Sequence, residues 1–218
     1  MLITLARKEF RELLPLIILG VILELYLACT ATGMRLGFFE ENSMGAIPFV
    51  SDQTSLLFFY ASGGIALALA LWQTMLESTR GTFQFLLHRP LERRAIFGTK
   101  LAVGGAACLF VAALPVLCYS LWAATPGTHA SPFQWSMTAW AWQMCLQMPL
   151  VYLGAFLSGL RPGHWFGTRF LPLAASVSAL TALQLISAWP WAILLACVAA
   201  EAGFVLVILS VGKSRDFS

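Results

Sequence analysis

Charged side chains are scarce in this sequence. Only 11% of its 218 residues are Asp, Glu, Lys or Arg, whereas 59% are hydrophobic and the mean hydropathy is +0.80. In soluble globular proteins about a quarter of all residues are charged. A chain with so few polar side chains cannot cover a water-facing surface, which excludes a soluble globule and a catalytic headpiece outside a membrane.

Signatures of catalysis and metal binding are also missing. The sequence has no H-E-x-x-H or G-x-S-x-G pattern, and Gly212-Lys213-Ser214 lacks the earlier glycine of a phosphate loop because that position is Val207. The five cysteines lie in apolar runs without metal or redox spacing, so we interpret them as small buried hydrophobes. We therefore expect no enzyme, cofactor or metal in this chain. The net charge of +3 is too small to indicate nucleic-acid binding.

Six apolar stretches dominate the chain, and each is long enough to cross a bilayer as a helix. Backbone amides find no partner in hydrocarbon, so these stretches must be helical. The sequence predicts an all-α polytopic membrane protein, with one transmembrane domain over residues 1–218. The predicted spans are residues 13–32, 54–76, 101–124, 135–160, 171–188 and 191–211.

Basic residues are distributed unequally between the two sides of these spans. One side carries Arg35 alone. Loops rich in Lys and Arg stay in the cytoplasm, so both termini are predicted to be cytoplasmic. The basic residues on the cytoplasmic side are Arg7, Lys8, Arg11, Arg80, Arg89, Arg93, Arg94, Lys100, Arg161, Arg169, Lys213 and Arg215.

The first twelve residues are amphipathic. Apolar side chains such as Ile3 and Phe10 recur at helical spacing, while Lys8 and other charged residues occupy the other face. This pattern predicts an interfacial helix over residues 1–12 with its cations toward lipid headgroups, and Pro15 then lets the chain turn into the first span. A solvated leader is the alternative.

The connection over residues 77–100 is predicted to be a helix, a break at Pro90 and a second helix. Its first helix has one apolar face, and its two ends continue into the second and third spans. A push on this segment would tilt both spans. The alternative is a positively charged loop that only fixes the topology.

The same segment carries a specific series of residues: an acidic residue, a Gly-Thr pair, two leucines, a His-Arg-Pro-Leu run and a basic pair. They are Glu77, Gly81-Thr82, Leu86-Leu87, His88-Arg89-Pro90-Leu91, Arg93-Arg94, Ile96 and Lys100-Leu101. This series closely resembles the coupling segment of ABC-2 type transporter permeases, the membrane subunits of ATP-driven exporters. The layout is also similar to that of haem-exporter B-type permeases.

The resemblance implies a permease subunit in the bacterial cytoplasmic (inner) membrane. Its partners would be a second copy or a sister permease, membrane lipids, and two cytoplasmic ABC ATPase subunits that bind ATP and magnesium. The ATPases would dock on residues 77–100, where Arg80, Arg89, Arg93 and Arg94 are the candidate partner-facing charges. The full set of candidate coupling residues is Glu77, Arg80, Gly81, His88, Arg89, Pro90, Arg93, Arg94 and Lys100.

Two acidic residues, Glu24 and Glu201, fall about midway in the first and last spans. A charge there costs roughly 2.5 to 3.5 kcal/mol on insertion scales. Each residue either lines a substrate path or proton route, or forms a hydrogen bond between helices. A proton-coupled carrier that uses both acids is therefore a rival to the exporter, and a membrane scaffold that transports nothing is another.

Overall fold

The computed structural model describes residues 2–32, 47–50, 54–80, 92–127, 132–161, 165–185 and 190–214. Within these residues the chain is helical and contains no strand, which confirms the all-α prediction. The elements are α1 (Leu2–Ala31), α2 (Thr54–Arg80), α4 (Arg93–Ala124), η2 (Trp135–Thr138), α5 (Ala139–Leu160), η3 (Trp165–Arg169), α6 (Leu171–Leu185) and α7 (Pro190–Ser214).

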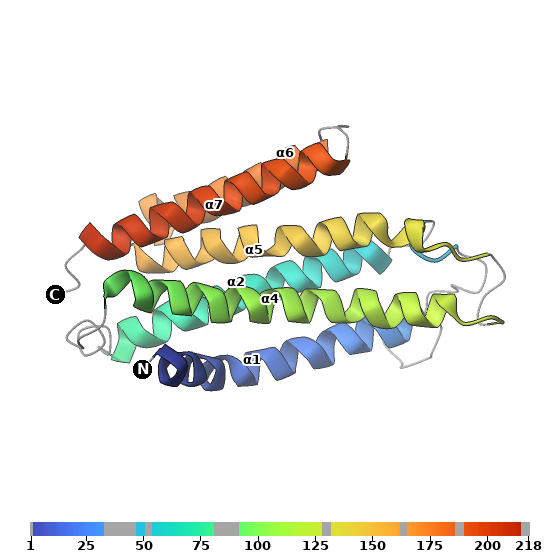
Figure 1. Cartoon of the computed structure of the whole chain (residues 1–218), viewed down its shortest axis with the longest axis horizontal. Coiled ribbons are helices and arrows are strands. Elements are labelled where there is room, and N and C mark those ends of the chain that lie inside the picture. Colours follow the sequence, from blue (N-terminus) through green and yellow to red (C-terminus); the bar gives the residue numbers. More distant parts are fainter. Residues whose placement is uncertain are drawn as a thin grey trace.

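The long helices alternate in direction along one bundle (Figure 1). The first residues of α1 and the last residues of α7 lie at the same end, where α2 also ends and α4 begins. We call this end the base of the bundle. Because the start of α1 and the end of α7 share it, the two ends of the described chain are on one side of the bundle, as the distribution of basic residues predicts.

The helix ends follow local chemistry. Pro190 opens α7, where its missing N–H and fixed φ are tolerated. The C-terminal end of α4 is at Ala124, shortly before Pro126 and Gly127. Gly127 has a φ of 85°, a left-handed conformation that glycine adopts without a steric cost.

Helix α5 forms the centre of the bundle and packs against α2, α4, α6 and α7. Residues 150–160 are all buried. The least apolar of the long helices is the most buried and the most apolar is the most exposed: the segment Trp135–Leu160 has a mean hydropathy of 1.3 and is 83% buried, whereas Trp191–Gly212 has 2.6 and is 11% buried. This relation is typical of a membrane protein, in which the most apolar helices face lipid and the less apolar helices pack in the interior.

Within the described residues, five helices are long and apolar enough to cross a membrane. They correspond to α1, α2, α4, α5 with η2, and α7. Helix α6 has 15 residues, which span about 22 Å at 1.5 Å per residue, less than a hydrocarbon core of about 30 Å. The fifth predicted span, residues 171–188, is thus a shorter apolar helix, and the six-span topology stays a prediction.

Helix α1 is continuous through Pro15, so the predicted helix of residues 1–12 does not end before the first span. Its first turns are seen more nearly end-on than the rest (Figure 1), so the axis bends, as a proline inside a helix causes. On the predicted apolar face, Ile3 is 83% exposed and Phe10 49%, so both can face lipid, whereas Glu9 and Leu13 are buried in the protein.

The two ends of the predicted coupling segment belong to the bundle itself. Helix α2 continues to Arg80, and α4 begins at Arg93. Residues 81–91, which include the predicted break at Pro90, lie outside the described residues, so the coupling helix stays a prediction.

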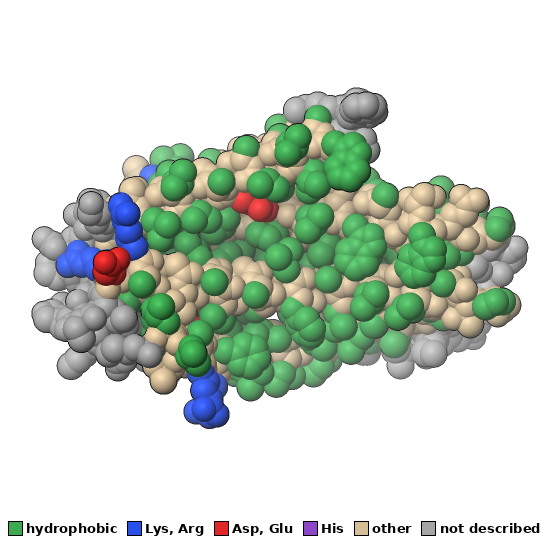
Figure 2. All heavy atoms as spheres, viewed as in Figure 1, with side chains coloured by type: hydrophobic (Ala, Val, Ile, Leu, Met, Phe, Trp, Pro, Cys, Tyr) green, Lys and Arg blue, Asp and Glu red, His purple; other side chains and the backbone are tan. Residues whose placement is uncertain are grey.

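The surface of the described chain separates charge from apolar groups. Lys and Arg side chains gather at the base, and hydrophobic side chains cover most of the remaining face (Figure 2). A wide apolar band bordered by cations at one end is typical of a membrane-embedded protein.

Substitution of one buried and one exposed phenylalanine tests the central position of α5. Phe156 on α5 is 0% exposed and Phe110 on α4 is 56% exposed. We expect Phe156→Ala to lower the free energy of unfolding by about 3 to 5 kcal/mol, and Phe110→Ala to lower it by less than about 1 kcal/mol. Unfolding by SDS in mixed micelles measures both values, and equal losses would contradict the assigned core.

Candidate functional site

A buried ion pair joins the base of α1 to the base of α4. The Glu9 Oε1 atom lies 2.9 Å from Lys100 Nζ, and both side chains are 1% exposed. The two residues are 91 positions apart in the sequence and meet because α1 packs along α4.

Two further polar side chains extend this pair to α2 and α5. Gln73 Nε2 donates to Glu9 Oε2 at 2.9 Å, and Tyr152 Oη donates to Gln73 Oε1 at 2.7 Å. Gln73 Nε2 also lies 3.2 Å from the Lys100 carbonyl oxygen. Glu9, Gln73, Lys100 and Tyr152, which we call the base network, thus connect four helices through consecutive hydrogen bonds.

A glycine makes room for the base network. A Cβ atom at Gly104, one turn after Lys100, would lie 2.5 Å from Tyr152 Cζ and 2.7 Å from Gln73 Oε1. Such distances are too short for any side chain, so the hydrogen bond between Tyr152 and Gln73 depends on a glycine here. The neighbouring Gly105 faces open space, with no atom within 4 Å of a Cβ.

The base network satisfies the charge that it buries. Both oxygens of the Glu9 carboxylate have hydrogen-bond partners. Lys8 Nζ also lies 3.6 Å from Glu9 Oε1, and the Lys8 side chain is 40% exposed. Removing two charges from water costs several kcal/mol per ion, which the pair offsets only with good geometry. Such a pair fixes relative position more than it adds stability, and loss of either partner leaves a buried unpaired charge.

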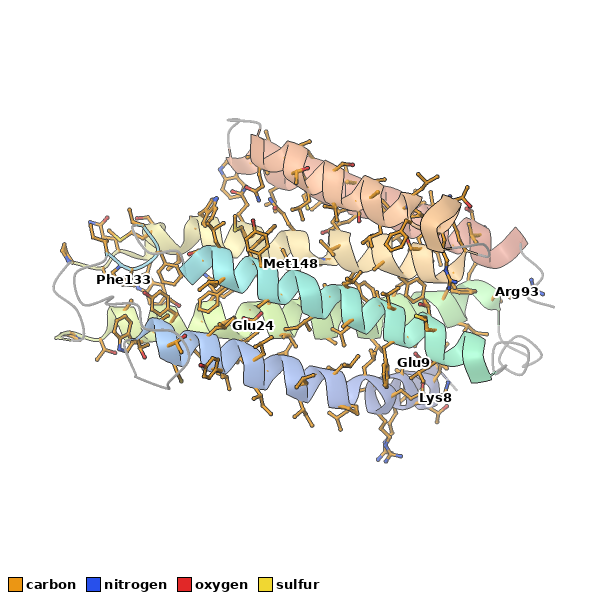
Figure 3. The ribbon with its side chains drawn as sticks, turned by 180° about the vertical axis from the view of Figure 1, so that it is seen from behind. Lys8, Glu9, Glu24, Arg93, Phe133 and Met148 are labelled. Carbon is orange, nitrogen blue, oxygen red and sulfur yellow. The ribbon has the colours of Figure 1, made fainter. Side chains whose placement is uncertain are left out.

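The position of the base network relates it to the predicted coupling segment. Gln73 lies about two turns before the end of α2 at Arg80, and Lys100 about two turns after the start of α4 at Arg93. The helices on either side of residues 81–91 are therefore both fastened to α1 and α5. Figure 3 shows Lys8, Glu9 and Arg93 at this same end.

Lys100, one of the candidate coupling residues, is buried at the base: its side chain is 1% exposed and bound to Glu9. Its part in coupling stays a prediction. The preceding turns of α4 carry the remaining charge: Arg94 is exposed and Arg93 half-buried at the start of α4. Among the other candidates, Glu77 and Arg80 lie in the last turn of α2, and Gly81, His88, Arg89 and Pro90 lie outside the described residues.

Glu24 forms the interhelical hydrogen bond that was one of its two predicted roles. It is 0% exposed on α1, and Ser62 Oγ of α2 donates to its Oε1 atom at 2.6 Å. Its second oxygen, Oε2, has no hydrogen-bond partner within the part of the chain that the structure describes.

Glu201 lies in a different environment, on the outer helix α7. It is partly exposed, and Cys197 Sγ of the same helix lies 3.6 Å from its Oε1 atom. No hydrogen bond between described residues connects Glu201 with Glu24, so the structure does not join the two acids into one route.

Three of the four residues of the base network escape sequence reasoning. Glu9, Gln73 and Tyr152 match no motif, and Gln73 and Tyr152 lie inside predicted spans. The available signal was the presence of uncharged polar groups within otherwise apolar helices. Spacing along the chain does not reveal which helices those groups join.

The described residues hold no group of three or more His, Cys, Asp or Glu side chains that could bind a metal ion. Comparison with protein-family models, with curated proteins and with solved structures finds no match for this chain.

A double substitution tests the base network. Lys100→Met leaves Glu9 as a buried unpaired carboxylate and should lower the free energy of unfolding by about 3 to 5 kcal/mol. Combining it with Glu9→Gln removes both charges and keeps an acceptor for Gln73, so most of the loss should be restored. The control is Lys8→Met, which removes an exposed charge and should cost less than about 1 kcal/mol.

Unfolding in mixed micelles measures the free energy of unfolding of all three variants. A double variant as unstable as Lys100→Met alone would show that the two charges do not act as a pair.

Proposed function

We propose that this chain is the transmembrane permease subunit of an ATP-binding cassette exporter in a bacterial inner membrane. It contributes the substrate path together with a second copy or a sister permease. Two cytoplasmic ATPase subunits bind ATP and magnesium and supply the hydrolysis. The observation that carries the proposal is the base network, because it fastens the helices that flank residues 81–91 to the rest of the bundle.

The base network gives the predicted coupling segment a mechanical role. An ATPase that pushed residues 81–91 would load the end of α2 and the start of α4. Glu9 and Tyr152 hold those ends to α1 and α5, so four helices move as one body instead of bending separately. Packed elements with two discrete arrangements convert such local forces into opening and closing.

The packing of α5 favours a path between two bundles. Residues 150–160 occupy the centre and are all buried, so a path along the axis of one bundle would require α5 to leave. The outer helix α7 is 11% buried and carries the partly exposed Glu201. A carboxyl at membrane depth is costly against lipid, so it is better accommodated at a partner permease or a wet path.

The same geometry bears on the rival carrier. A proton-coupled carrier that used Glu24 and Glu201 would need both acids along one route. Glu24 faces α2 inside the bundle, whereas Glu201 belongs to the outer helix α7. This separation favours the exporter.

The test is purification of the tagged chain from membranes of its native host in mild detergent. We expect an ATPase subunit to copurify, and the double variant Arg93→Glu/Arg94→Glu to lower the bound ATPase activity on the order of tenfold, about 1.4 kcal/mol of binding. The matched control is Arg11→Glu, a charge reversal at an exposed residue of α1, which should retain the ATPase.

The other outcomes identify the rivals. Uptake into vesicles driven by a pH gradient without ATP would replace the exporter with the carrier. Copurification of no nucleotide hydrolase, together with no substrate flux, would replace it with the scaffold.

A further inference from the structure

A small cavity lies between α2, α4 and α5, toward the end opposite the base. Its lining includes three sulfur-bearing side chains of α5, Met144, Cys145 and Met148, and two hydroxyls of α2, Ser55 and Ser62. The space open to the centre of a water molecule is ≈ 10 Å³. A site of this size holds one water-sized particle.

The three sulfur atoms belong to one face of α5. At about 100° per residue, Met144, Cys145 and Met148 lie within a sector of about 100°, with Met148 between the other two. Their exposed fractions are 5%, 6% and 1%. Thioether and thiolate sulfur are soft ligands that favour Cu(I) over hard cations such as magnesium or calcium.

Apolar packing explains the sulfur atoms but leaves one group of this cavity unexplained. Methionine and cysteine are ordinary core residues. Ser55, however, lines the same cavity, is 4% exposed and has no hydrogen-bond partner for its Oγ atom within the described chain. A buried hydroxyl without a partner is costly and calls for an explanation, which a particle bound in the cavity would supply.

The charges around the cavity favour a cation of charge +1. Binding to Cys145 breaks its S–H bond, forms a sulfur–metal bond and releases the proton to water, so a monovalent ion and the thiolate together are neutral. A divalent ion would leave a buried net charge, which is expensive in a low dielectric. Glu24 accepts a hydrogen bond from Ser62, which also lines the cavity. Figure 3 shows Glu24 and Met148 at similar positions along the long axis of the bundle.

We propose that this cavity, the sulfur site of Met144, Cys145 and Met148, binds a single soft monovalent metal ion of the Cu(I) class. The site uses no residue of the base network and does not rest on the proposed ATPase coupling.

The test uses the full chain, purified in detergent under anaerobic, reducing conditions, with Cu(I) delivered from a chromophoric chelator. We expect one Cu(I) per chain and release of about one proton. Cys145→Ser and the double variant Met144→Leu/Met148→Leu should each weaken binding by at least about tenfold, since even outer-shell partners of metal sites contribute 10- to 100-fold. Methionine to leucine conserves volume, so the double variant should remain folded.

Two variants outside the cavity serve as matched controls: Cys118→Ser on α4 and Met75→Leu on α2. Both should bind Cu(I) like the wild-type chain, and Zn(II) should not displace the ion. The proposal is overturned by absence of saturable binding, by equal binding in Met144→Leu/Met148→Leu, by loss of binding in Cys118→Ser, or by displacement with Zn(II). Copurification of an ATPase is scored separately, so failure of the metal site is distinguishable from failure of the exporter assignment.

Discussion

The buried pair of Glu9 and Lys100 is the constraint on which the arrangement of the base depends. Two opposite charges withdrawn from water must meet with all their hydrogen bonds satisfied. Lys100 pairs with one oxygen of the Glu9 carboxylate, and Gln73 donates a hydrogen bond to the other. This requirement fixes the rotation of α1, because Glu9 must face inward, and the register of α4 against α1. Gly104 then sets how closely Tyr152 of α5 approaches. The four helices consequently have one arrangement at the base, whatever the lipid around them.

Above the base, the arrangement of the helices reflects lipid, and not water, as the surrounding solvent. Lipid gives no hydrophobic reason for apolar helices to associate, so close packing and polar bonds hold the interior together. Ser62 bonds to Glu24 between α1 and α2, and Gln184 bonds to Gln147 at 2.7 Å between α6 and α5. The most apolar helix, α7, is accordingly the most exposed.

Much of the fold could be predicted from the sequence, because the thickness of a bilayer dictates the length of each apolar run. The predicted span 54–76 begins where α2 begins, and the predicted ends at 124 and 160 are the ends of α4 and α5. The sequence does not show that Glu9 turns inward in α1, because nothing near it in the chain marks the residues that it meets. It also does not show that Lys100 is buried, because the partner of this lysine is 91 residues away.

The most direct measurement of the central claim is hydrogen–deuterium exchange in the chain with Glu9→Ala. If the base network holds four helices as one unit, exchange should accelerate in the base halves of α1, α2 and α4 together and stay unchanged in α7, which contributes nothing to the network. Acceleration confined to α1, with α2 and α4 protected as in the wild-type chain, would contradict the account.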